Sequence, residues 1–134
     1  MKTTVLDQIK EAGCIFTSHK DIPDQLTEAN TPLESINSII WSHHHLDHTG
    51  DPSVFPKSTS LVVGPGFKSE KTTFPGYPKN PDAIVLEDAF EGRELVELDF
   101  STGLDIGGFP SIDFFGDGSF YILQSPGHSG YIFP

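Results

Sequence analysis

The most informative stretch of this sequence is Ile39-Ile40-Trp41-Ser42-His43-His44-His45-Leu46-Asp47-His48-Thr49-Gly50-Asp51. Its first three residues end an apolar segment that begins at Ile36, and four of the six histidines of the chain follow within residues 43–48. An apolar run of this length predicts a buried strand over residues 36–41. A loop at the end of a buried strand is rigidly anchored, as a metal site requires.

The spacing within the cluster indicates which side chains could share a metal ion. Neutral imidazole and carboxylate groups are the usual zinc ligands in catalytic sites. His43 and His45 are two residues apart, so in an extended segment their side chains point the same way and could bind one ion. Asp47 and His48 would continue into a turn and could face a second ion nearby. His44 would then point away, into packing or solvent.

Three other interpretations of the cluster fit the residues less well. Purification tags lie at chain termini and lack an internal aspartate. A solvated polar loop would not follow directly from the apolar residues 39–41. A helical zinc-protease motif needs Glu after its first histidine, and starting from His44 that position holds His45. The cluster therefore favours metal binding.

His128 is the natural third ligand, although only the fold could bring it to the cluster. It follows Ser125-Pro126-Gly127, a sharp turn that could present the imidazole ring at the end of a strand. Alone, such a histidine would more often be structural. In a chain that also carries the cluster, we interpret it as a ligand.

The other segments predict mostly short strands with few helices. We expect strands over residues 61–63, 83–86 and 93–100, with a turn at residues 91–92 between the last two. Residues 114–115 and 120–123 flank Gly116-Asp117-Gly118-Ser119, which predicts a hairpin. A short helix is expected over residues 6–12, and residues 14–35 are expected to form a loop that includes one helical turn.

Composition narrows the classes of partner. The chain has 134 residues, the size of one domain, and 8 basic against 19 acidic residues give a net charge of −11. Such a charge repels polyanions, so neither nucleic acid nor an anionic membrane is an expected partner. No segment approaches the roughly 18 apolar residues of a membrane span.

The N-terminal sequence and the cysteine content predict a cytoplasmic location. Residues 1–7 lack the apolar run of a signal peptide. Cys14 is the only cysteine, so the chain has no internal disulfide, and a reducing compartment is the default expectation.

The residues of the histidine stretch resemble the signature of the metallo-β-lactamase superfamily. That signature has two His separated by one residue, then one more residue, then Asp-His and a nearby Gly, as in residues 43–50 here. Residues 115–119 and 125–129 are similar to later motifs of its lactonase-like members, and residues 62–66 and 113–121 resemble fungal members. The resemblance runs from about residue 36 to residue 134, so we treat residues 1–134 as one partial domain.

The resemblance implies an α+β fold, the four-layer αββα sandwich of that superfamily, of which the chain would form the N-terminal part. It implies that His43, His45 and His128 bind a first zinc ion. Asp47, which would also be the catalytic residue, and His48 would begin a second site. The substrate would be a small molecule such as a lactone-like cyclic ester or amide, whose carbonyl carbon is attacked by metal-bound hydroxide.

The sequence also departs from the family pattern. Members supply a bridging Asp after the Pro-Gly-His motif and a final His later, and none of the residues after His128 is Asp or His. The second site is therefore predicted to be incomplete, with one zinc ion bound and weak or absent activity. A truncated sandwich would leave one sheet face uncovered, and we expect it to favour self-association.

Two rival interpretations remain open at this stage. The chain could be a non-catalytic remnant that binds metal at a single three-histidine site. It could also be a redox member of the same superfamily that uses iron. Zinc is preferred because the recognisable neighbours are lactonase-like, which is an argument by analogy.

Overall fold

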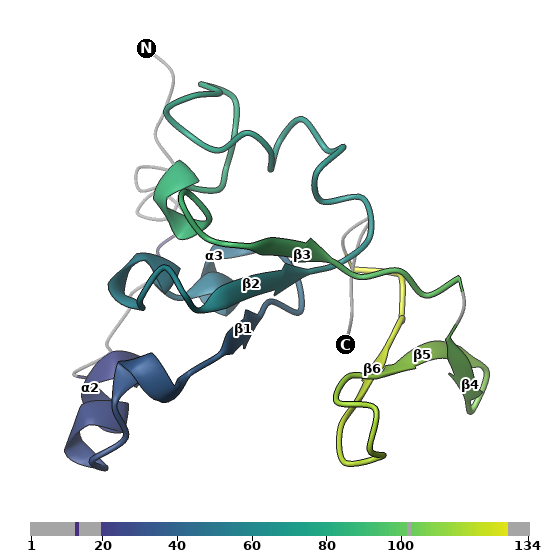
Figure 1. Ribbon diagram of the computed structural model, residues 1–134. Coiled ribbons are helices and arrows are strands. Elements are labelled where there is room, and N and C mark those ends of the chain that lie inside the picture. The colour runs from purple at the N-terminus through teal and green to yellow at the C-terminus, as the bar shows by residue number, and fades with distance from the viewer. Residues whose placement is uncertain (1–12, 14–19, 102, 129–134) are drawn as a thin grey trace.

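The computed structural model describes residue 13, residues 20–101 and residues 103–128. The elements follow in the order α2 (Ile22–Glu28), η1 (Leu33–Ser35), β1 (Ser38–Ile40), α3 (Leu46–Thr49), η2 (Pro52–Val54), β2 (Ser60–Val63), η3 (Glu87–Ala89), β3 (Leu95–Glu97), β4 (Leu104–Ile106), β5 (Phe109–Asp113) and β6 (Tyr121–Leu123). The strands form two three-stranded sheets (Figure 1). This mixture of helices and sheets confirms the α+β class. The four-layer sandwich remains a prediction, and the helix expected over residues 6–12 lies outside the described residues.

The first sheet is parallel and has the strand order β1-β2-β3. Its register aligns Ile39 with Leu61 and Leu61 with Leu95, and the next row aligns residues 40, 62 and 96. Successive side chains of a strand point to opposite faces, so both faces of this sheet carry aliphatic rows. Both rows are covered, which is the usual condition of a parallel sheet.

One face of the parallel sheet packs against the long segment between β2 and β3. The row of Ile39, Leu61 and Leu95 belongs to a core cluster that also contains Trp41, Val63, Phe67, Phe74, Val85, Ala89 and Phe90. Phe67 and Phe90 pack edge to face, with ring centroids 6.1 Å apart. This segment has little regular structure, but its aromatic side chains complete the core.

The other face packs against the second sheet. Val62 is buried in one cluster with Leu98, Phe100 and Ile122, and Ile40, Val96, Ile112 and Phe114 pack against this cluster. The cluster thus joins all three parallel strands to β5 and β6. The two sheets therefore share a hydrophobic layer, although most of the second sheet is exposed.

The second sheet is antiparallel, with the order β4-β5-β6. Strand β4 was not predicted from the sequence, and its three residues are all exposed. The turn between β4 and β5 is Gly107-Gly108, and both residues have positive φ, of 63° and 89°. Two-residue turns with positive φ favour glycine and connect hairpin strands, so this dipeptide was a signal that could have predicted β4. The predicted hairpin around residues 116–119 is confirmed, with Asp113 paired to Tyr121.

Two other sequence predictions were wrong. Residues 83–86 are not a strand, and their segment contributes one isolated bridge, Tyr77 to Leu86. Strand β3 pairs in parallel with β2, so the predicted turn at residues 91–92 joins no pair of strands.

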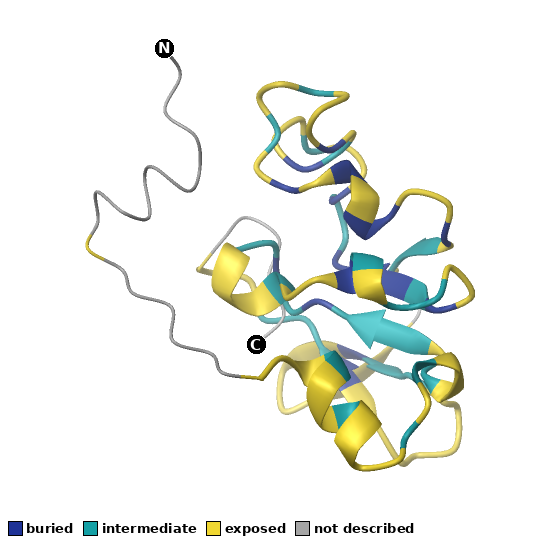
Figure 2. Cartoon of the chain, turned by 90° about the vertical axis from the view of Figure 1, so that its left-hand side faces the viewer, coloured by how far each residue is buried: buried dark blue, intermediate teal, exposed yellow. Residues whose placement is uncertain are grey.

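The loop predicted over residues 14–35 contains a seven-residue helix, α2, which is largely exposed (Figure 2). Pro23 lies in its first turn, where proline is tolerated, and Asp21 caps it by accepting a hydrogen bond from the Asp24 amide.

Arg93 ties the start of β3 to the loop that follows α3. Its buried guanidinium donates to the carbonyl oxygens of Pro52 at 2.6 Å, Thr59 at 2.9 Å and Phe55 at 3.2 Å. Arginine can satisfy several carbonyls at once because its five N–H groups are held in one plane.

Among the residues that the structure describes, no helix is long and apolar enough to cross a membrane.

Candidate metal centre

Strand β1 delivers the first histidine to the carboxyl end of the parallel sheet. The Trp41 amide donates to the Val62 carbonyl at 3.0 Å, so strand pairing continues one residue beyond β1. His43 follows two residues later and is 9% exposed. Ligands in open sheets commonly bind outside the carboxyl ends of the strands, and His43 lies at such a position.

The third histidine arrives from the other sheet. The chain leaves β6 and returns toward the carboxyl ends of the parallel strands, which brings His128 beside His45 (Figure 1). Residues 45 and 128 are far apart in the sequence, so the fold alone creates this contact. The predicted grouping of His43, His45 and His128 is therefore present.

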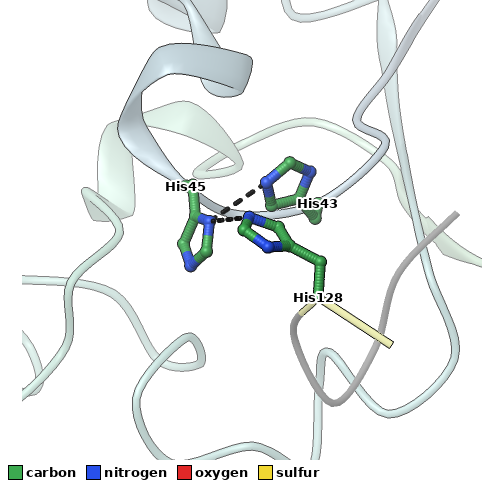
Figure 3. A group of neighbouring side chains, drawn as sticks. All are labelled: His43, His45 and His128. Carbon is green, nitrogen blue, oxygen red and sulfur yellow. Dashed lines mark hydrogen bonds between the residues drawn. The ribbon is translucent and has the colours of Figure 1, made fainter. Parts of the chain in front are cut away.

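The three imidazoles direct one nitrogen each toward a common point (Figure 3). The Nε2 atom of His43 lies 3.1 Å from the Nδ1 atom of His45, which lies 3.2 Å from the Nε2 atom of His128. All three nitrogens are within 4.8 Å of one another. At Zn–N distances of 2.0–2.1 Å, two ligands of a tetrahedral ion are about 3.3 Å apart, so the spacing fits a shared zinc ion.

The ring orientations are consistent with that fit. The His128 ring is nearly perpendicular to the His43 and His45 rings, at 85° and 89°. Stacked rings would turn their nitrogens away from one another. Rings that meet edge-on can instead place three lone pairs around one ion.

The protonation of His43 also suits metal binding. Burial is the main cause that holds its pKa below the usual imidazole value, and the neighbouring imidazoles of His48, His45 and His128 lower the pKa further. A neutral imidazole is the form that binds a metal. The Ser42 hydroxyl lies 3.1 Å from Nδ1 of His43, and a partner on that nitrogen leaves Nε2 directed at the site. Ser42 was not predicted as a site residue, although a hydroxyl residue directly before the first histidine was a visible signal.

Asp47 and His48 lie beside the three-histidine group but are not part of it. Both belong to α3, and Oδ2 of Asp47 is 3.4 Å from Nε2 of His48. The His48 ring packs on the His43 ring with centroids 4.1 Å apart. Within the described part of the chain, the three histidines form the one group of three or more potential ligands that could hold an ion. The roles predicted for Asp47 and His48 therefore remain predictions.

His44 is directed elsewhere. It is half-buried and lines a small pocket with Trp41, Val63, Phe67 and His43, and it is not one of the three histidines whose nitrogens converge. Burial lowers its pKa, and the nearby His45 lowers it further, while Glu70 acts in the opposite direction. His44 therefore offers a comparison for the ligand histidines, because it is adjacent to them and contributes no atom to the group.

The sequence is similar to curated fungal proteins. It is 49% identical over 128 residues to gamma-lactamase MBL2 of Gibberella moniliformis, a match that covers 94% of this chain and 53% of that protein. It is 47% identical over 125 residues to metallo-hydrolase mfmC of Annulohypoxylon moriforme, which covers 90% of this chain and 33% of that protein. No protein-family model matches the chain, and no solved structure matches it.

A third relative carries a different name. The chain is 52% identical over 123 residues to cytochrome P450 monooxygenase mpaDE of Penicillium brevicompactum, which covers 86% of this chain and 14% of that protein. A match to so small a share of a protein does not assign that protein's named activity to the matched region. Across these relatives the chain spans about half of the protein or less.

These findings agree with the class that the site defines, a candidate three-histidine metal centre on an α+β scaffold. The relatives named gamma-lactamase and metallo-hydrolase also confirm the resemblance that the histidine motif indicated. The chain is a metallo-β-lactamase-like sequence that corresponds to part of each of these proteins.

Proposed function

We propose that this chain is the metal-binding part of a zinc-dependent hydrolase that opens a cyclic amide or ester. The observation that carries the proposal is the convergence of His43, His45 and His128 on one point, with neighbouring nitrogens 3.1 Å and 3.2 Å apart. The names gamma-lactamase and metallo-hydrolase of the relatives support hydrolysis, and the first favours a cyclic amide over an ester.

The donor set supports zinc over iron. Three imidazoles with an open position are a known catalytic zinc set, whereas non-haem iron oxygenases typically use two His and one carboxylate on one face of the ion. The group here contains three histidine nitrogens and no carboxylate. When bound, zinc would lower the pKa of a coordinated water to about 7 and polarise a substrate carbonyl.

The protein's own residues would orient this chemistry. The His43 ring is held in place by its burial and by its hydrogen bond with the Ser42 hydroxyl. Asp47 is two-thirds exposed, so its carboxylate, although 3.4 Å from Nε2 of His48, is accessible to a substrate and could accept a proton. We propose Asp47 as the catalytic carboxylate on this basis.

We also propose one zinc ion per chain for these 134 residues. Asp47 and His48 supply two potential ligands for a second ion, whereas a catalytic zinc site usually has at least three protein ligands. A lone ion would lack the electrostatic stabilisation that a second ion gives to the developing negative charge. For scale, the loss of a single oxyanion donor can already lower the rate by about 10²–10³. We therefore expect slow hydrolysis by the chain alone.

The test combines metal analysis with a hydrolysis assay. Purified chain loaded with zinc should contain about one equivalent and should open a five-membered lactam or lactone slowly. His43→Ala should lose both properties, whereas the matched His44→Ala variant should keep its zinc. Absence of zinc from the loaded chain would overturn the proposal. Bound zinc without any ring opening would favour the non-catalytic remnant, and preferential iron binding would favour the redox alternative.

A further inference from the structure

Trp41 is a buried residue whose indole makes a partly buried hydrogen bond that the proposed chemistry does not use. The residue is 2% exposed, and its indole Nε1 donates to the carbonyl oxygen of Thr49 at 2.8 Å. A buried tryptophan usually finds a partner for its N–H group. The partner here is informative because Thr49 is the last residue of α3, the helix that carries Asp47 and His48.

The Thr49 carbonyl has a structural need for this donor. The last carbonyl groups of a helix have no partner within the helix, and α3 is a single turn that ends at Thr49 and is followed by Gly50, where φ is 56°. A glycine with positive φ turns the chain away from the helix axis. The indole therefore satisfies a carbonyl that the helix itself leaves free.

The same residue also holds the beginning of the segment. The Trp41 amide donates to Val62 in β2, which fixes the point where the chain leaves the sheet. Trp41 thus anchors residues 42–49 at one end through its backbone and at the other through its indole. His43 and His45 lie within this closed segment, and the His48 ring packs on His43.

From this arrangement we infer that Trp41 is a positioning residue of the metal centre, and the inference rests on the proposed metal binding. The indole N–H holds α3 against the strand end so that His43 and His45 keep their nitrogens within reach of one ion. Without it, the next hold on the chain beyond α3 would be the Arg93 hydrogen bond to the Pro52 carbonyl, so α3 itself would be less firmly held. The metal would then have to order the segment when it binds, which lowers affinity.

Packing must be separated from positioning, because Trp41 also belongs to the core. Its ring lies 6.1 Å from the Phe67 ring, and both belong to the cluster on one face of the parallel sheet. Phe67 is buried and lies in the segment after β2, where its ring packs against Trp41 and Phe90, and it lines a small pocket together with His43 and His44. Phe67→Leu is therefore a matched control that disturbs the core and leaves the indole bond intact.

The sequence allows a clean removal of the indole N–H. Trp41 is the only tryptophan, so growth on β-(3-benzothienyl)alanine, which has sulfur in place of the N–H, changes this position alone. Zn²⁺ affinity should fall roughly threefold to tenfold, the range expected for one lost hydrogen bond. The visible absorption of bound Co²⁺ should change as well. If the analogue lowers the yield of folded protein, Trp41→Phe can be measured in its place. It also lacks the indole N–H group and should also lower Zn²⁺ affinity.

Phe67→Leu should lower thermal stability while its Zn²⁺ affinity stays within about twofold of the unsubstituted chain. The inference is overturned if the analogue and Trp41→Phe bind Zn²⁺ as tightly as the unsubstituted chain. It is also overturned if Phe67→Leu weakens binding equally, because core packing would then be the cause. An unsubstituted chain that binds no Zn²⁺ would overturn both the proposed function and this inference. The two outcomes above overturn this inference alone, because in both of them the unsubstituted chain still binds Zn²⁺.

Discussion

The two sheets of this molecule differ sharply in burial, and the candidate metal centre draws on both. In the parallel sheet, Leu61, Val62 and Val63 of β2 are almost completely buried. In the antiparallel sheet, β4 is exposed throughout, and Leu104 is 53% exposed. His43 and His45 follow a strand of the first sheet, and His128 follows the last strand of the second. The well-buried sheet therefore leads to two of the ligands, and the more exposed sheet leads to the third.

The largest expected effect contrasts one leucine from each sheet. Leu61→Ala should lower the free energy of unfolding by about 2–5 kcal/mol, because it removes a fully buried side chain and leaves a cavity. Leu104→Ala should change it by less than about 0.5 kcal/mol, because the side chain is half exposed. Urea denaturation followed by Trp41 fluorescence would measure both. Equal losses in the two variants would show that the sheets contribute alike to stability.

An intermediate effect contrasts two side chains that hold loop backbone. Arg93→Met should lower the free energy of unfolding by about 2–3 kcal/mol, because the carbonyls of the buried residues Pro52 and Thr59 lose a charged donor. In the second region, the Asp113 carboxylate accepts from the amides of Gly116 and Gly118 at 3.0 Å and 2.8 Å. Water can replace these bonds in an exposed turn, so Asp113→Ala should cost about 0.5–1 kcal/mol. Calorimetric unfolding should rank the two variants, and a costlier Asp113→Ala would reverse the comparison.

The same contrast explains what the sequence could predict. Apolar runs located β1 and β2 because both faces of the parallel sheet are covered, which leaves β1 half-buried and β2 almost fully buried. The histidine cluster predicted His43 and His45 as a pair, since the spacing of two residues places both side chains on one side of an extended segment. The later Pro-Gly-His motif, read with the cluster, predicted His128. All three follow from local patterns together with a resemblance.

The wrong secondary-structure predictions concern segments whose structure depends on whether a neighbouring strand is present to pair with them. Residues 83–86 do alternate in burial, with Val85 buried between exposed Ile84 and Leu86, so the pattern correctly reported burial. Among the described residues, strand pairing of this segment is limited to the isolated bridge from Leu86 to Tyr77, and alternation alone cannot show this. The indole bond from Trp41 to Thr49 was equally hidden, because it depends on where a single helical turn ends.

The smallest expected effect is a pH dependence confined to the first region. Burial and neighbouring imidazoles lower the pKa of His43 in the folded chain, while the unfolded chain keeps a value near 6.5. Between these two values the unfolded state binds more protons, so the stability of the metal-free chain rises with pH in this window and falls on acidification. His43→Gln should weaken this dependence. It should not abolish it, because the half-buried His44 also has a lowered pKa and acts in the same direction. Urea titrations at several pH values would measure the slope, and an unchanged slope in His43→Gln would contradict the assignment.

The central claim is that ligands from both regions hold one metal ion, and X-ray absorption at the zinc edge tests it most directly. The zinc-loaded chain should show three imidazole ligands at about 2.0–2.1 Å. His128→Ala should show two imidazoles and a larger share of oxygen ligands, or should lose the ion, while His44→Ala should keep all three. A His128→Ala spectrum identical to that of the unsubstituted chain would contradict the account, because the second sheet would then contribute nothing to the metal site.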